Sequence, residues 1–142
     1  MSLRFPTILE EVTSVWLSEA LSVRYPGTSV AKVKTGTTIG GSATKAQLFL
    51  EYAANPLGLP NTIWAKCGWD THVPETLAMC ATEAHFYKDL APSLRIELPE
   101  TYFELIDGDG INGVVLLEDL HARNVSFENE AGCEGDLSTE AI

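Results

Sequence analysis

The run at residues 61–67, Asn-Thr-Ile-Trp-Ala-Lys-Cys, places Lys66 at the end of a short apolar segment that has the pattern of a strand. A buried ammonium group without an opposite charge is strongly destabilising, so a strand keeps such a lysine where an anion meets it. Glu83, within a helical pattern, is the internal candidate for that anion, and a bound phosphate is the external one. Alternatively, Lys66 lies at a strand end and extends its ammonium group into water.

Length and composition limit the classes of protein to which the chain can belong. Its 142 residues are the size of one domain, with 45% hydrophobic and 20% charged residues, as in ordinary globular proteins. The 20 acidic residues exceed the 9 Lys and Arg, giving a formal charge of -11, which argues against nucleic acid as the main partner. We also expect no membrane partner, because no apolar run approaches the length that spans a membrane. We expect a cytoplasmic location, because three cysteines without C-x-x-C spacing indicate neither a disulfide framework nor a zinc site.

The order of periodic segments predicts an α+β fold. A helix is predicted to begin at Thr7, which has the capping-box spacing with Glu10, and to end before residues 25–27. Strands are predicted at 30–35, 45–52, 62–67, 101–106 and 113–117, in one antiparallel sheet, and a second helix between Pro74 and Pro92. The apolar face of the first helix is expected at Ile8, Leu9, Val12, Val15, Trp16, Ala20 and Val23, and that of the second at Leu77, Cys80, Ala81, Ala84, Tyr87 and Leu90.

Two connections between the predicted strands contain several glycines. Residues 36–44 are rich in glycine and hydroxyl groups, and residues 107–112 have the Asp-Gly pattern of a hairpin turn. Asp107, Asp109 and Glu118 also match the first, third and twelfth positions of a calcium loop. Ile111 and Asn112 break that pattern and the flanking segments are strand-like, so a hairpin is the better interpretation.

This order of elements resembles the amino-terminal lobe of the aminoglycoside phosphotransferase and ecdysteroid-kinase-like families, which are related to choline kinases and more distantly to protein kinases. The resemblance covers residues 30–120 and is strongest in the strings EAHFY at 83–87 and VLLEDL at 115–120. It implies a protein-kinase-like small lobe, with a five-stranded antiparallel sheet, a packed helix and an N-terminal helix. The implied division is an N-terminal helix at 1–28, a nucleotide-binding lobe at 29–120 and an acidic linker at 121–142.

The resemblance assigns roles in binding ATP to residues of this lobe. Lys66 would hold the α- and β-phosphates, and Glu83 would orient it through an ion pair. Backbone groups of Glu118, Asp119 and Leu120 would meet the adenine edge, with apolar walls such as Ala65 and Leu117 on either side of the ring. The backbone of residues 36–44 would lie over the phosphates, with the glycines and one hydroxyl at Gly36, Gly40, Gly41 and Ser42. The sequence departs here from the stricter motifs, since it contains neither G-x-G-x-x-G nor Gly-Lys-Ser/Thr. Judged alone, this segment is better interpreted as a plain hairpin turn that uses the conformational freedom of glycine.

The family's catalytic groups do not occur in this sequence. Its His-Gly-Asp-x-His-x-x-x-x-Asn string and the later Asp-Trp or Asp-Phe pair, which bind magnesium and the acceptor, belong to a carboxy-terminal lobe. We therefore expect the complete enzyme to phosphorylate a hydroxyl group of a small molecule with ATP and magnesium, and this chain alone to transfer no phosphate. The face under residues 118–120, which would contact that lobe, is expected to favour self-association. The alternative is a stand-alone α+β module that binds a small apolar ligand, in which Lys66 and Glu83 are structural.

Overall fold

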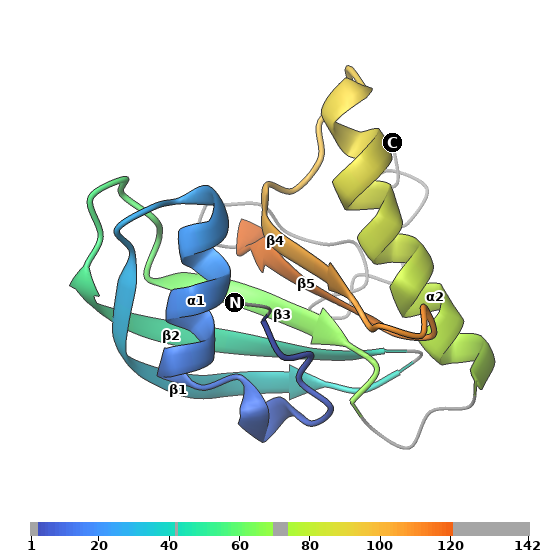
Figure 1. Ribbon diagram of the computed structural model, residues 1–142, viewed down its shortest axis with the longest axis horizontal. Coiled ribbons are helices and arrows are strands. Elements are labelled where there is room, and N and C mark those ends of the chain that lie inside the picture. Colours follow the sequence, from blue (N-terminus) through green and yellow to red (C-terminus); the bar gives the residue numbers. More distant parts are fainter. Residues whose placement is uncertain (1–2, 42, 70–73, 121–142) are drawn as a thin grey trace, which may run out of the picture.

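The computed structural model describes residues 3–41, 43–69 and 74–120. Within that part, the chain forms a five-stranded antiparallel sheet in the order β1-β2-β3-β5-β4, together with two α-helices (Figure 1). The predicted α+β class and antiparallel sheet are confirmed. The elements are α1 (Ser14–Arg24), β1 (Ser29–Ile39), β2 (Thr44–Ala54), β3 (Thr62–Cys67), α2 (Pro74–His85), β4 (Thr101–Ile106) and β5 (Gly113–Glu118), with short helical turns η1 (Leu9–Glu11), η2 (Phe86–Leu90) and η3 (Ala91–Ser93).

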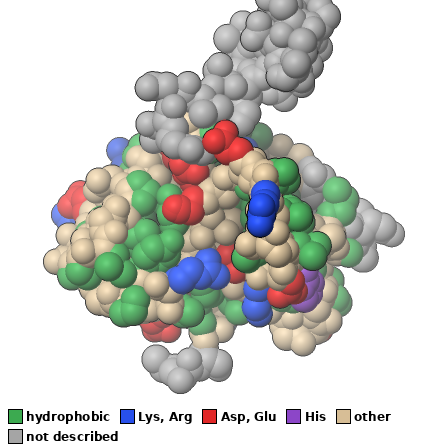
Figure 2. Space-filling view, turned by 90° about the horizontal axis from the view of Figure 1, so that it is seen from above, with side chains coloured by type: hydrophobic (Ala, Val, Ile, Leu, Met, Phe, Trp, Pro, Cys, Tyr) green, Lys and Arg blue, Asp and Glu red, His purple; other side chains and the backbone are tan. Residues whose placement is uncertain are grey.

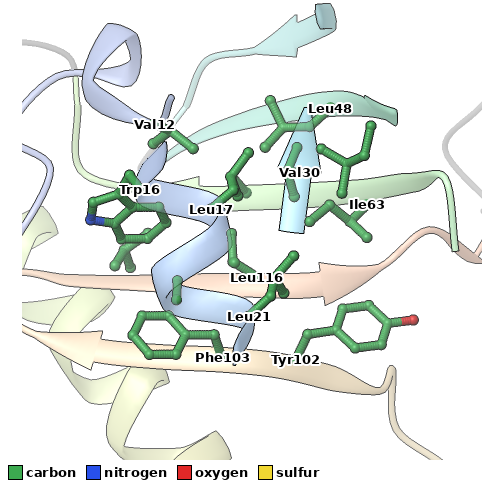
Figure 3. Close-up of a cluster of buried hydrophobic side chains, with 14 of the residues drawn as sticks. Val12, Trp16, Leu17, Leu21, Val30, Leu48, Ile63, Tyr102, Phe103 and Leu116 are labelled. Atoms are coloured by element: carbon green, nitrogen blue, oxygen red, sulfur yellow. The ribbon is translucent and has the colours of Figure 1, made fainter. Parts of the chain in front are cut away.

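The two helices pack on opposite faces of the sheet. Successive residues of a strand point to opposite sides, and in β5 Val114 and Leu116 contact the α1 side whereas Val115 and Leu117 face α2. The α1 face contains the larger core, in which Leu17 and Leu21 of α1 pack over the sheet and Phe103 of β4 belongs to the same cluster (Figure 3). The α2 face has a smaller cluster, because α2 lies over β5 and β4 and reaches only the edge of β3.

The first helix begins later than the sequence predicted. Thr7 does not cap it: its N–H donates to Glu11 Oε1 at 2.7 Å, and residues 9–11 form the separate turn η1. The cap is Thr13, whose Oγ1 accepts a hydrogen bond from the Trp16 N–H at 3.1 Å. This start turns Val15 and Val23 to solvent, with exposures of 66% and 68%. Ile8, which precedes η1, is also 49% exposed, so the expected apolar face is wrong at these three positions.

The second helix changes its winding near its end. Residues 86–90 form η2, a π-helical turn, before the short turn η3 at Ala91 and Pro92. A π-turn has more residues than an α-turn, so it rotates the following side chains relative to the α-helical pattern. Leu90 is accordingly 56% exposed and does not belong to the apolar face that contains Cys80, Ala81 and Ala84.

The strand boundaries agree closely with the sequence pattern except in the first hairpin. β3 and β4 match their predicted ranges, and the predicted turn between β4 and β5 is closed by a hydrogen bond from Asp107 N to Asn112 O at 2.9 Å. β1, however, continues to Ile39 and pairs with β2 along that length. The predicted linker at 121–142, with Cys133 and His121, lies outside the described residues, as does His72. No described helix has both the length and the apolar character that a membrane crossing requires.

Candidate functional site

The predicted ion pair between Lys66 and Glu83 is present. Lys66 Nζ lies 3.0 Å from Oε1 and 3.2 Å from Oε2 of Glu83, so the ammonium group contacts both carboxylate oxygens. The side chains are 29% and 28% exposed, which leaves one side of the pair open to solvent. The pair joins β3 to α2 and remains accessible to a ligand.

Local periodicity explains why these two side chains meet. In β3, Ile63, Ala65 and Cys67 are buried on the α1 face, so alternation places Lys66 on the α2 face. In α2, the buried residues occupy the face toward the sheet, and Glu83 lies beside them at the edge of that face. The carboxylate therefore reaches the strand that α2 only partly covers.

An open cavity of about 580 Å³ lies beside the ion pair. One wall is the turn between β1 and β2, another is Lys66 on β3, and the rest comes from α2 and η2. Thr82 and the ion pair supply the polar groups. The lining residues are Ala43, Lys66, Met79, Cys80, Thr82, Glu83, Phe86 and Tyr87. A cavity of this size, with a few polar groups in an apolar wall, has the character of small-molecule sites.

Two titratable groups in the cavity wall are held in their neutral forms. Burial raises the pKa of the Cys80 thiol, and the negative charge of Glu83 raises it further, although Lys66 acts in the opposite direction. Burial and then Glu83 likewise raise the pKa of the Tyr87 phenol. Since a thiolate is the reactive form of cysteine, Cys80 is an unreactive wall residue at neutral pH.

The glycines expected above the phosphates are divided between a strand and a turn. Gly36 belongs to β1, and a Cβ atom there would lie 2.4 Å from Phe49 Cε2, so the missing side chain makes room for an aromatic ring on β2. Placing Gly36 in the connecting loop was wrong. Gly40 and Gly41 do lie in the turn that ends at the cavity wall, and Gly41 has a φ of 153°, which favours glycine. Ser42 lies outside the described residues.

The segment expected to meet adenine already has protein partners. The Glu118 N–H donates to Glu100 O at 2.8 Å, and the Glu118 carboxylate accepts from the Glu100 N–H at 3.0 Å. Asp119 is 4% exposed and accepts a hydrogen bond from Gln47 Nε2 at 3.1 Å. The Glu118 amide is thus used by the protein itself, and Gln47, a partner that the sequence analysis did not identify, fixes the position of Asp119.

The apolar walls proposed for the adenine ring do not lie on the same face of the sheet. Ala65 is fully buried in the α1 core, on the opposite face from Lys66, so its expected role is wrong. Leu117 does lie on the α2 face, where its strand partner is Trp64. Trp64 is partly buried, packs against the cluster on the α2 face and shares that face with Lys66. Strict alternation along β3 was the signal that could have identified it.

Potential metal ligands are scattered in the described part of the chain. No group of three or more His, Cys, Asp or Glu residues that could hold a metal ion occurs there. Asp107 and Asp109, considered above as calcium ligands, accept hydrogen bonds from the backbone of their own turn. On the face seen in Figure 2, basic and acidic side chains lie close to one another, with apolar side chains between them.

Comparisons of the chain with protein-family models, with curated proteins and with solved structures found no match.

Proposed function

We propose that this chain is the nucleotide-binding part of an ATP-dependent small-molecule phosphotransferase, with a protein-kinase-like small lobe. The observation that carries the proposal is the ion pair between Lys66 and Glu83 beside an open cavity, with Ala43 of the glycine-containing turn in the cavity wall. In phosphoryl transfer, a lysine of this kind binds phosphate oxygens and a helix carboxylate holds it in position.

The chemistry of the site follows from its charges. The Lys66 ammonium group can donate to a phosphate oxygen while Glu83 retains it by a second contact, because a lysine has three donors. The backbone of Gly40 and Gly41 has no side chains to prevent approach of an anion. Magnesium, in the complete enzyme, would neutralise the phosphates, and a hydroxyl group of a small molecule would accept the transferred phosphoryl group.

Calorimetric titration with MgATP tests this proposal. We expect the unmodified chain to bind MgATP and Lys66→Met to weaken binding about tenfold or more, since hydrogen bonds to charged groups contribute roughly 1.5–3 kcal/mol. Glu83→Gln should weaken binding less, because the lysine remains. Lys88→Gln, which removes a positive charge from an exposed position outside the cavity lining, is the matched control and should bind like the unmodified chain. Equal effects of Lys66→Met and Lys88→Gln would contradict the proposal.

The apolar part of the cavity wall favours a second candidate function, a module that binds a small apolar ligand. Met79, Phe86 and Tyr87 line the same cavity as the ion pair. In this alternative, a fluorescent apolar dye should bind in the cavity, Phe86→Ala should weaken its binding, and MgATP should not displace it. Displacement of the dye by MgATP favours the nucleotide site.

A further inference from the structure

Among the described elements, no helix packs over the part of the α2 face that β1 and β2 form, and this part of the sheet carries lysines and aromatic rings. On β1, β2 and β3, the register places Lys34 opposite Phe49, and Lys45 opposite Lys66. Directly opposed residues in an antiparallel pair share a face. Gln47 is opposite Trp64 in the same way. Phe49 is 42% exposed, and α2 does not pack over this part of the sheet.

Lys45 and Lys66 form an unfavourable pair that the protein separates. Like charges directly opposite in a sheet destabilise it. The two ammonium groups have different partners: Lys66 binds Glu83, whereas Lys45 Nζ lies 5.1 Å from the centroid of the Trp64 ring. In the described part of the chain, Lys45 forms no salt bridge. The ammonium group of Lys45 thus lies against the face of the Trp64 ring, and it is available to an anion that binds over β2 and β3.

We propose that Lys45 is a second phosphate-binding residue of the nucleotide site, which selects nucleoside di- and triphosphates over monophosphates. This inference rests on the proposed function. A polyphosphate that lies over β2 and β3, on the α2 face of the sheet, draws Lys45 away from Trp64 and is then contacted by lysines of both strands. A nucleoside monophosphate has one phosphate, which Lys66 already holds, whereas a di- or triphosphate offers Lys45 a further phosphate. The exchange of partners also frees the partly buried Trp64 ring for contact with the ligand.

Trp64 provides a direct optical signal for this exchange. Trp16 and Trp69 are 7% and 9% exposed, and their indole N–H groups donate to the backbone oxygens of Arg4 and Pro6. Both rings belong to the core on the α1 face. A change in tryptophan emission on ligand binding therefore reports on Trp64, and Trp64→Phe should abolish it.

The test is a set of titrations of the folded chain with MgATP, MgADP, AMP and adenosine, followed by calorimetry and tryptophan emission. Lys45→Gln should weaken MgATP and MgADP about tenfold but AMP and adenosine less than about threefold, because only the polyphosphates reach it. Lys45→Arg, which retains the charge, should restore MgATP binding to within about threefold. Lys34→Gln, the same charge change on β1, is the control and should alter MgATP binding less than about twofold.

Each other outcome has a defined meaning. Wild-type affinity and an unchanged emission signal in Lys45→Gln overturn the role of Lys45 and leave the nucleotide site intact. Equal weakening of all four ligands also overturns it, since that pattern indicates a general disturbance of the sheet. Failure of the folded wild-type chain to bind any of the nucleotides overturns the proposed function itself, and with it this inference.

Discussion

At the scale of single residues, Glu104 on β4 has the most fully buried carboxylate among the ion pairs of the described residues. Its side chain is 1% exposed, and its two oxygens accept hydrogen bonds from Arg24 at 2.7 and 3.1 Å. The hydrogen bond to Glu104 raises the pKa of the Arg24 guanidinium group, although burial opposes the effect. Arg24 also donates to Thr101 O, so one side chain of α1 fastens the helix to the edge strand β4.

We predict that Arg24→Met lowers the free energy of unfolding by roughly 2–4 kcal/mol, because it leaves a buried carboxylate without its partner. Urea unfolding followed by circular dichroism measures this change. Arg4→Met is the control: it removes an ion pair of 3.7 Å in which Arg4 is 84% exposed, and such pairs contribute about 0–1 kcal/mol. Similar losses in the two variants would show that the Arg24 contact is no stronger than a surface pair.

The same scale shows which parts of the candidate site the sequence could predict. The pairing of Lys66 with Glu83 follows from two local periods, the alternation of β3 and the helical repeat of α2, and it is present. The error at Ala65 came from choosing a neighbour in sequence, because adjacent strand residues face opposite sides. The position of Gly36 in β1, instead of in the loop, was not predictable from local sequence, because glycine is required there by the ring of Phe49 on β2.

At the scale of elements, the contact between α2 and β5 positions Glu83. The two elements lie close together at Gly113, where an added Cβ atom would lie 2.7 Å from Cys80 O and 2.9 Å from Ala84 Cβ. The helix backbone cannot move away from this atom without changing the packing of the whole element. The missing side chain of one strand residue thus sets the distance between the helix and the sheet.

Gly113→Ala is therefore expected to destabilise the chain by about 1–3 kcal/mol, the usual range for overpacking, and to weaken MgATP binding by displacing Glu83. Gly108→Ala is the matched control, because a Cβ atom there has no neighbour within 4 Å. It should leave both properties nearly unchanged. Thermal unfolding and the MgATP titration measure the two effects, and equal stability of the two variants would contradict the packing argument.

The boundaries of the elements were predictable only where local signals were unambiguous. β3 follows from alternation, and β4 from the apolar run before the Asp-Gly turn. The turn after Arg24 follows from the Pro26-Gly27 pair, in which Gly27 has a positive φ. The start of α1 was misassigned because Thr7 and Thr13 both offer a capping hydroxyl. The side chain of Glu11 decides between them by bonding to Thr7, and a spacing rule does not include that competition.

At the scale of the whole molecule, the sheet is covered unequally on its two faces. The core under α1 spans all five strands, whereas the cluster under α2 is confined to the side of β3, β5 and β4. A chain with one fully buried face and one half-open face can keep its stability in the first and bind ligands at the second. The cavity beside α2 lies on this second face of the sheet, as do Lys45 on β2 and Lys66 on β3.

The ionisation of the tyrosines at high pH tests how tightly their side chains are packed in the fold. Burial is the largest cause that raises the pKa of each of the four, Tyr25, Tyr52, Tyr87 and Tyr102, and it brings that of Tyr52 to about 12. As the pH rises past 10, the unfolded chain loses these protons first, and the folded state then binds more protons than the unfolded state. The free energy of unfolding therefore falls with rising pH above about 10 and is unaffected by these groups at neutral pH.

We expect phenolate absorbance to appear together with loss of the circular dichroism signal in an alkaline titration, because the folded chain resists ionisation. Below about pH 10, Tyr52→Phe should lower the free energy of unfolding by roughly 1 kcal/mol, because the Tyr52 hydroxyl donates a hydrogen bond to Pro60 O at 2.6 Å. Its stability should then fall less steeply between pH 10 and about 12 than that of the unmodified chain. Phenolate formation near pH 10 in a chain that is still folded would show that solvent reaches Tyr25, Tyr52 and Tyr102, and that the core on the α1 face is not closed as its side-chain packing indicates.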